Sequence, residues 1–173
     1  MQGAPDQAAL ADKLAIHEQI YNYCRSVDRL DVPLGHAVFH EDSVADFPTY
    51  KGTGQGWIDA VCKEHLNFLH HSHQVTNVIV DLHGPDAGRV ERAGSEAYVT
   101  ANLRQQDGER VTNRMFSARY IDTWSKRGGR WAIDRRDCIV DFSEVKDVTP
   151  LGNDARSARD HSDPSYGVLE DAA

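Results

Sequence analysis

A carboxylate at a helix end and a histidine at the start of a strand are the residues of this chain best suited to acid–base chemistry. Asp28 comes four residues after Cys24, so it continues the apolar stripe of a helix into its last turn. Negative charge is disfavoured at that end of a helix, although a solvated aspartate is an equally good interpretation. His73 opens an alternating segment. Because an imidazole titrates close to neutral pH, His73 is the candidate general base.

Other kinds of chemistry are poorly supported. Five histidines lie between positions 65 and 83, and His71 and His73 share one face of the expected strand. Their spacings match no recognised zinc pattern with a fourth ligand, so we expect neither a metal ion nor a cofactor. The glycines at 52, 54 and 56 do not follow a buried strand of a βαβ unit, as a dinucleotide loop would require. No serine or cysteine stands in a nucleophile elbow, so acyl transfer is not indicated.

Length, charge and cysteine content narrow the class of protein. The chain has 173 residues, which suggests one domain, and a net charge of −8, which argues against binding nucleic acid. No apolar run approaches the roughly 20 residues of a membrane span. The N-terminus has no basic patch followed by an apolar stretch, so we expect no signal peptide, no membrane partner and a cytoplasmic location. Cys24, Cys62 and Cys138 are widely spaced and are expected to be buried free thiols.

Periodicity predicts helices first and a meander of strands afterwards. A period near 3.6 predicts helices over residues 9–28 and 55–69, with a short helix or loop over 33–40. A period of two predicts strands over 43–50, 71–82, 89–105, 111–124 and 130–142. Turns are expected at 50–54, 84–88, 107–108 and 127–129. This order predicts an α+β fold, in which helices cover a strongly curved, mostly antiparallel sheet and enclose an apolar, cone-shaped pocket.

The same patterns assign side chains to faces. In the first helix the apolar residues form two adjacent rows, one of Leu10, Leu14, Tyr21 and Cys24 and one of Ile16, Ile20, Tyr23 and Val27. Strict alternation puts Ile79 on the face of His73 and Val80 on the opposite face. In the last strand it puts Arg136 opposite Ile133. A bulge is expected near Gly94. The domain is expected to span residues 1–146, followed by a polar tail, 147–173, that packs on a neighbouring subunit.

Six short motifs, in this order and spacing, carry a resemblance to a known family. They are Tyr23-Cys24-Arg25-Ser26-Val27-Asp28, Thr49-Tyr50-Lys51-Gly52, His73-Gln74-Val75-Thr76-Asn77, Arg119-Tyr120-Ile121-Asp122, Trp131-Ala132-Ile133-Asp134-Arg135-Arg136 and Asp163-Pro164-Ser165-Tyr166. The chain resembles the SnoaL-like branch of the NTF2-like superfamily, which includes hexachlorocyclohexane dehydrochlorinase, scytalone dehydratase and bile-acid 7α-dehydratase. The resemblance covers residues 9–142 and the tail fragment, and it implies a cone-shaped α+β fold.

The resemblance also implies roles for individual residues. In these lyases an aspartate that closes the first helix pairs with a histidine that opens a strand, which corresponds to Asp28 and His73. An arginine five residues after the last-strand tryptophan corresponds to Arg136, whose alternative is a surface pair with Asp134 or Asp137. Tyr23 replaces the lysine of the dehydrochlorinase, as in the bile-acid dehydratase, although plain helix packing explains it equally well. Scytalone dehydratase has a tyrosine just before its aspartate, so Val27 argues against scytalone as the substrate.

The resulting hypothesis is a cofactor-independent lyase, a dehydratase or dehydrohalogenase, acting on a small cyclic or aromatic hydroxylated compound. His73 would abstract a proton, Asp28 would fix its tautomer, and Tyr23 or Arg136 would stabilise the developing negative charge. Substrate contacts are expected from Tyr50, Trp57, Asn77 and Phe116. The alternatives are an isomerase that uses the same proton abstraction, a ligand-binding protein without turnover, and a β-type subunit of a ring-hydroxylating oxygenase.

Self-association and one salt bridge are also expected. The lyase relatives imply a homo-oligomer, with a trimer preferred to a dimer. Arg119 is expected to form a structural salt bridge with Asp122 or Glu96.

Overall fold

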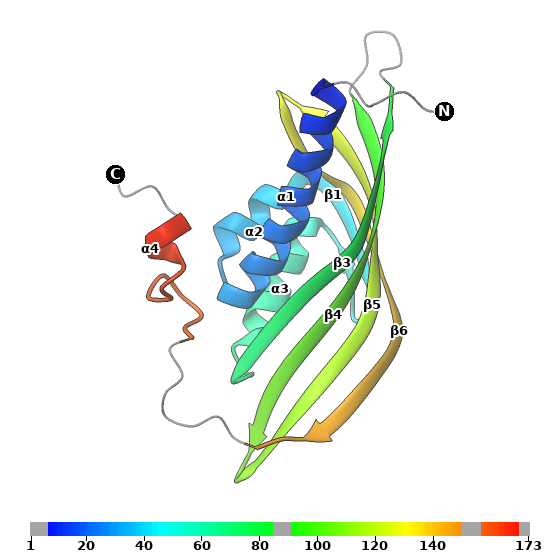
Figure 1. Cartoon of the computed structure of the whole chain (residues 1–173). Coiled ribbons are helices and arrows are strands. Elements are labelled where there is room, and N and C mark those ends of the chain that lie inside the picture. Colours follow the sequence, from blue (N-terminus) through cyan, green and yellow to red (C-terminus); the bar gives the residue numbers. More distant parts are fainter. Residues whose placement is uncertain (1–6, 85–90, 150–156, 170–173) are drawn as a thin grey trace.

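A layer of helices covers the concave face of a curved sheet (Figure 1). The computed structural model describes residues 7–84, 91–149 and 157–169. In chain order its elements are α1 (Gln7–Arg29), α2 (Val32–Val38), β1 (Phe39–Phe47), β2 (Tyr50–Gly52), α3 (Gly54–His65), β3 (His70–His83), β4 (Arg92–Asp107), β5 (Arg110–Arg127), β6 (Arg130–Asp147) and α4 (Tyr166–Leu169). The predicted α+β fold is thus confirmed. Of the described helices, none combines the length and apolar character that crossing a membrane requires.

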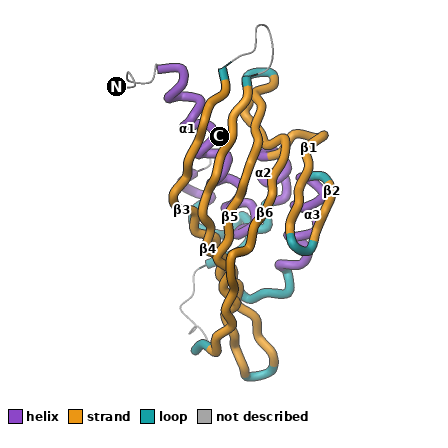
Figure 2. The backbone as a smooth tube through the Cα atoms, turned by 90° about the vertical axis from the view of Figure 1, so that its right-hand side faces the viewer, coloured by secondary structure: helices purple, strands orange, loops and turns teal. Residues whose placement is uncertain are grey.

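The sheet is a meander to which the first hairpin is added at one edge. Its strand order is β2-β1-β6-β5-β4-β3 (Figure 2). All neighbouring strands pair antiparallel except β1 and β6, which are parallel. The turns between β4, β5 and β6 contain glycines with positive φ, at Gly108 (58°) and Gly128 (59°), a backbone conformation that glycine adopts at little cost. The turn expected at 84–88 lies, beyond Gly84, outside the described residues.

Bulges fall at places that strict alternation did not predict. The pairing of β4 with both neighbouring strands runs without interruption through Gly94, so the prediction of a bulge there is wrong. The register shift lies in β3 between Thr76 and Ile79, around Asn77, whose φ is 50°. An extra residue in one strand reverses the faces beyond it. Accordingly Val80 is buried and Ile79 is 61% exposed, the reverse of the expectation.

The buried face of α1 differs from one of the two predicted rows. Of the row that contains Leu10, only Cys24 is buried, whereas Leu10, Leu14 and Tyr21 are each at least half exposed. The second row is correct, because all its members lie in the core: Ile16, Ile20, Tyr23 and Val27. This row packs between the sheet and the other helices, so it fixes the rotation of α1 about its axis. The rotation in turn decides where Asp28 points.

Several element boundaries also differ from the prediction. Tyr50–Gly52 is a short edge strand paired with β1 rather than part of a turn. α3 ends at His65, and Leu66 beyond it is 63% exposed. β6 continues to Asp147, five residues past its predicted end.

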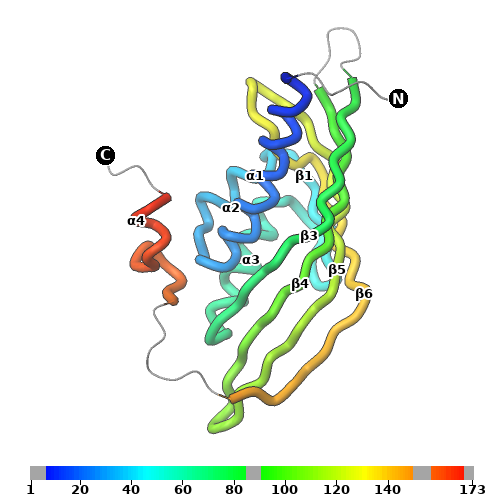
Figure 3. Tube along the Cα trace, viewed as in Figure 1, coloured from blue at the N-terminus to red at the C-terminus, as the bar shows by residue number. Residues whose placement is uncertain are grey.

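Residues 157–169 pack against the helices of the same chain (Figure 3). Arg25 Nη1 donates to the Ser165 hydroxyl at 2.9 Å, and the Tyr166 hydroxyl donates to Asp31 at 3.0 Å. Arg159 Nη1 donates to the backbone oxygen of His65 at 2.8 Å. The segment therefore ties together the ends of α1 and α3. Packing of the tail on a neighbouring subunit stays a prediction.

Candidate active site

The end of α1 places Asp28 opposite the start of β3. α1 stops at Arg29 because Leu30 adopts a left-handed conformation with φ of 55°. The Asp31 amide then donates back to the Ser26 carbonyl at 2.8 Å, and the Leu30 amide to the Val27 carbonyl at 3.4 Å. This pair of bonds is the usual way in which a left-handed residue closes a helix. It fixes the last turn of α1, and with it the direction of the Asp28 side chain.

Asp28 and His73 form the pair that the family resemblance implied. Asp28 Oδ1 lies 2.7 Å from His73 Nδ1, and Oδ2 accepts the backbone N–H of His73 at 2.9 Å. The two side chains are only 15% and 8% exposed. Because a carboxylate accepts the bond, Nδ1 carries the proton and the Nε2 lone pair is left free. Among the described residues no group hydrogen-bonds Nε2, so His73 has the tautomer that a general base needs.

His73 borders an apolar cavity of about 210 Å³ on the concave side of the sheet. The walls come from α1, α3, β1 and strands β3 to β6, and they include Tyr23, Trp57, Phe116 and Tyr120. Dry apolar cavities of roughly 150 Å³ hold benzene. The cavity therefore has room for a small cyclic compound. Two of the four predicted substrate contacts, Trp57 and Phe116, lie in its wall.

The polar groups of the wall include two tyrosine hydroxyls. Trp57 Nε1 donates to the Tyr23 oxygen at 2.8 Å, and the Tyr23 hydroxyl has no acceptor within the described part of the chain. Tyr120 stands edge-on to Tyr23, with ring centroids 5.4 Å apart. Burial raises the pKa of both tyrosines, so both hydroxyls keep their protons and are able to donate a hydrogen bond to a ligand. Tyr120 was not predicted as a site residue, although it lies beside Arg119 in one of the quoted motifs.

The prediction that Arg136 contacts the substrate is wrong, because Arg136 is fully buried and does not line the cavity. Its Nε and Nη2 donate to the two carboxylate oxygens of Asp122, each at 2.7 Å. The alternative prediction, a surface pair with Asp134 or Asp137, is thus also wrong. The guanidinium carbon lies 4.2 Å from the ring centroids of both Tyr23 and Tyr120. Arg136 therefore supports the two tyrosines from behind and has no direct path to a bound molecule.

Two other predicted contacts are absent from the cavity wall. Asn77 sits exposed at the β3 bulge, because the extra residue there turns it away from the cavity. Tyr50 packs its ring 5.5 Å from Trp57, and its hydroxyl donates to the Thr53 carbonyl at 3.1 Å. Tyr50 thus supports Trp57 from the side of the edge strand.

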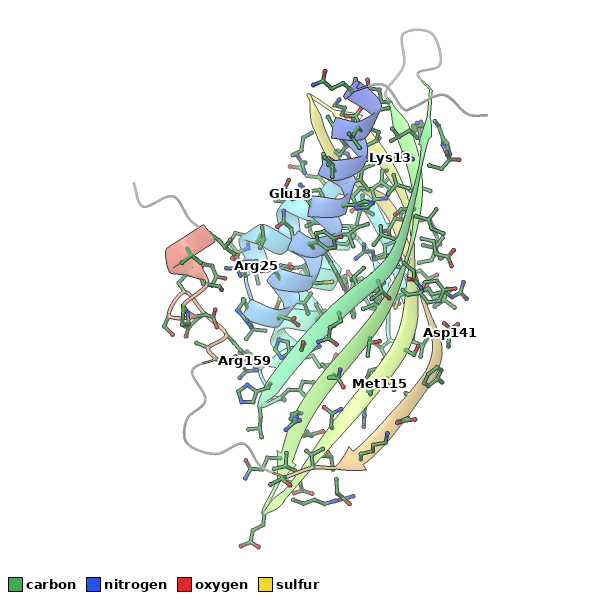
Figure 4. All side chains as sticks on the ribbon, viewed as in Figure 1. Lys13, Glu18, Arg25, Met115, Asp141 and Arg159 are labelled. Atoms are coloured by element: carbon green, nitrogen blue, oxygen red, sulfur yellow. The ribbon has the colours of Figure 1, made fainter. Side chains whose placement is uncertain are left out.

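The charged network around Arg119 is structural. Arg119 Nη1 donates to Glu96 at 3.0 Å, which confirms one of its two predicted partners. The second partner is Asp141 and not Asp122. Figure 4 shows Asp141 on the side of the sheet away from the helices. The network is therefore remote from the cavity.

Two further histidines adjoin His73. His65 lines the cavity and His71 donates its Nε2 proton to the Val27 carbonyl at 2.7 Å. Burial lowers the pKa of His65 to about 3 and also lowers the pKa of His71. Both are therefore neutral near neutral pH. Within residues 7–84, 91–149 and 157–169, no group of three potential ligands is arranged to hold a metal ion.

These lowered pKa values predict a pH dependence of stability. The unfolded chain binds a proton at His65 near pH ~6.5, whereas the folded chain does so only near about 3. Between these values the unfolded state binds more protons, so the free energy of unfolding falls as the pH falls. Replacing His65 with the non-titrating glutamine should flatten the slope by up to about 1 kcal/mol per pH unit. Urea denaturation at several pH values measures the slope for wild type and for the His65→Gln variant. Equal slopes would contradict the lowered pKa of His65.

The protein is an α+β domain in which helices cover the concave face of a curved sheet. An Asp28–His73 pair lies beside an apolar cavity between them. Residues 8–137 match the SnoaL-like domain family, and the chain belongs to that family. Among curated proteins no sequence matches the chain.

Solved structures of low sequence identity share the fold. One is a protein provisionally named a scytalone dehydratase from Novosphingobium aromaticivorans, with 22% identity, coverage of 83% of this chain and 95% of that chain, and a TM-score of 0.66. Another is the LinA-type3 hexachlorocyclohexane dehydrochlorinase from Novosphingobium barchaimii, with 14% identity, coverage of 82% and 93%, and a TM-score of 0.65. A third is a protein of unknown function from Mycobacterium tuberculosis, with 19% identity, coverage of 80% and 76%, and a TM-score of 0.65. At these identities the likeness shows the fold alone.

Proposed function

We propose that the protein is a cofactor-independent lyase that eliminates water from a small cyclic or aromatic hydroxylated compound. The observation that carries this proposal is the Asp28–His73 pair, whose free Nε2 belongs to a side chain in the wall of an apolar cavity. The names of two structural neighbours, a dehydratase and a dehydrochlorinase, are in keeping with it. In such a site a neutral imidazole can accept a proton from carbon at neutral pH.

The proposed reaction needs only groups of this chain. His73 Nε2 takes a proton from the carbon next to a substrate carbonyl; the C–H electron pair forms the C=C bond of an enolate, and the C=O π pair moves to the oxygen. The Tyr23 hydroxyl donates a hydrogen bond to that developing oxyanion. The enolate then reforms the carbonyl and expels the β-hydroxyl, which takes the Nε2 proton and leaves as water. Asp28 stabilises the imidazolium between the two steps.

Replacing Asp28 with asparagine should lower kcat by about 10²-fold or more, with a small change in stability. The amide has nearly the shape of the carboxylate, but its NH₂ group can donate to Nδ1. The histidine proton would then move to Nε2, which removes the lone pair that faces the substrate. Steady-state kinetics with far-ultraviolet circular dichroism as a folding control test this. Unchanged kcat in a folded D28N protein would mean that Asp28 does not set the tautomer.

A panel of three small ketones separates the possible reactions. 3-Hydroxycyclohexanone tests dehydration, 3-chlorocyclohexanone tests loss of HCl, and cyclohex-3-enone tests isomerisation. All three give cyclohex-2-enone, whose conjugated carbonyl is followed by ultraviolet absorbance. We expect the hydroxy compound to react, with the D28N protein as the matched control. If wild type and D28N behave alike on all three and on larger hydroxylated rings, a binding protein or an oxygenase β-type subunit becomes the better account.

Self-association is also part of the proposal. On the outer side of the sheet Tyr98 and Ile139, which are 42% and 43% exposed, flank Arg119 across three paired strands. Large apolar groups at such a place favour burial against another copy. We expect a homo-oligomer, with a trimer preferred, and Ile139→Glu should shift it toward monomer. Sedimentation velocity of both proteins decides this, and a wild-type monomer would reject the expectation.

A further inference from the structure

His65 is a nearly buried histidine that the proposed reaction does not use. It is the last residue of α3, it is 6% exposed, and it lines the same cavity as His73. The rings of His65 and His73 are almost parallel, with an interplanar angle of 21° and centroids 6.1 Å apart. The ring of His71 is also close to that of His65, with centroids 4.6 Å apart. His65 thus packs against two histidines of β3, one of which is the proposed base.

The hydrogen-bonding capacity of His65 is unused. Its Nδ1 is enclosed and has no partner within the described ranges of the chain. Its Nε2 has no hydrogen-bond partner there either, but it is not enclosed in the same way. The backbone oxygen of His65 is occupied by Arg159, so only the ring remains available. Because Nδ1 is enclosed, Nε2 is the ring nitrogen that a ligand can reach, and a ligand can supply the hydrogen bond that Nε2 lacks.

Burial, more than the neighbouring groups, keeps this ring neutral by lowering its pKa. His71 and His73 face it from β3, and Arg159 approaches its backbone. The Arg159 cation also opposes a positive charge on His65, as a protonated His71 or His73 would. A neutral imidazole offers one N–H donor and one acceptor, which suits a hydroxyl or a carbonyl and gives no charge attraction to an anion.

We infer that His65 is a specificity-determining residue, which hydrogen-bonds an oxygen substituent of a cyclic ligand held in this cavity. The inference rests on the proposed function only for the statement that the reacting carbon of that ligand lies at His73. Since the two ring centroids are 6.1 Å apart, the bound oxygen would lie a few bonds from the reacting carbon. A hydrocarbon or halogenated ring leaves the His65 nitrogens without a partner. The site therefore selects oxygenated rings over these.

Binding of two inert probes tests this contact without any turnover. Phenol and toluene have similar shape and differ in one hydroxyl group. Calorimetry or ligand-observed NMR gives their dissociation constants for wild type, His65→Phe, His65→Gln and His70→Phe. H65F keeps an aromatic ring and removes both nitrogens, and H65Q keeps an amide nitrogen near the position of Nε2. His70 is outside the cavity wall, so H70F is the matched control.

We expect wild type to prefer phenol to toluene, and H65F to lose about 3- to 10-fold of that preference. Toluene affinity should stay unchanged in H65F, H65Q should restore part of the preference, and H70F should match wild type. An undiminished preference for phenol in H65F would overturn the inference, as would failure of wild type to bind either probe. As a second measurement on wild type, the ¹⁵N resonances of His65 should shift with phenol and not with toluene; absence of that shift would also overturn it.

The proposed lyase and the His65 contact can fail separately. If the ketone panel shows no elimination but the phenol preference depends on His65, the lyase proposal fails and the contact stands. If elimination occurs and the preference for phenol is independent of His65, the lyase proposal stands and the His65 contact fails.

Discussion

Replacing His73 with asparagine is expected to lower kcat for elimination by about 10²–10⁴-fold, the usual contribution of a general base. The asparagine amide lies near the position of Nδ1, so it can still donate to Asp28. The backbone N–H of residue 73 also keeps its bond to Asp28 Oδ2. What the variant lacks is Nε2, the only nitrogen of the pair that is free to accept a proton. The loss should therefore fall on kcat, with a smaller change in KM.

The measurement uses whichever compound of the ketone panel wild type converts to cyclohex-2-enone. His70→Asn, on the same strand but outside the cavity wall, is the matched control and should keep wild-type kinetics. Thermal unfolding of both variants shows whether the fold is retained. An H73N protein with kcat within threefold of wild type would reject His73 as the base, whatever the outcome for Asp28.

Replacing Arg136 with methionine is expected to lower the free energy of unfolding by about 3–5 kcal/mol. The change leaves the Asp122 carboxylate buried without the two bonds that now satisfy it. It also removes the cation stacked on Tyr23 and Tyr120. Replacing both members of the pair, as R136M together with Asp122→Leu, should recover much of the loss, because no buried charge remains.

Urea denaturation of the single and double variants measures these changes. Arg135→Met is the matched control from the same strand, because Arg135 is 47% exposed on its side chain and pairs with Asp137 at the surface. Exposed pairs contribute at most about 1 kcal/mol, so R135M should be close to wild type. Equal effects of R136M and R135M would show that the Asp122–Arg136 pair carries little of the stability.

The fold class followed from local patterns, since helix and strand periods depend on neighbours along the chain. Helices over 7–29 and 54–65 and the long strands of the meander lie close to their predicted positions. Asp28 was recognised because a carboxylate in an apolar helical stripe is unusual, and His73 because a histidine titrates near neutral pH. Their pairing came from the family resemblance, and the 2.7 Å contact agrees with it.

Only the tertiary structure decided which side chains face the cavity. An extra residue at Asp134 shifts the pairing of β6 with β5, so Ile133 and Arg136 are both buried where alternation put them on opposite faces. The bulge at Asn77 acts in the same way on β3. The position of a bulge depends on the register with the neighbouring strand, which is a long-range property.

Contacts between distant parts of the chain also decide which residues line the cavity. Tyr120 lies in a quoted motif and His65 in the histidine cluster, but both reach the cavity only because distant elements converge there. The sequence by itself determined the order and type of the main elements, and it singled out Asp28 and His73 as candidates for acid–base chemistry. The packing of elements decided the rest, because contacts between residues far apart in the chain arise only when the sheet curves and the helices cover it.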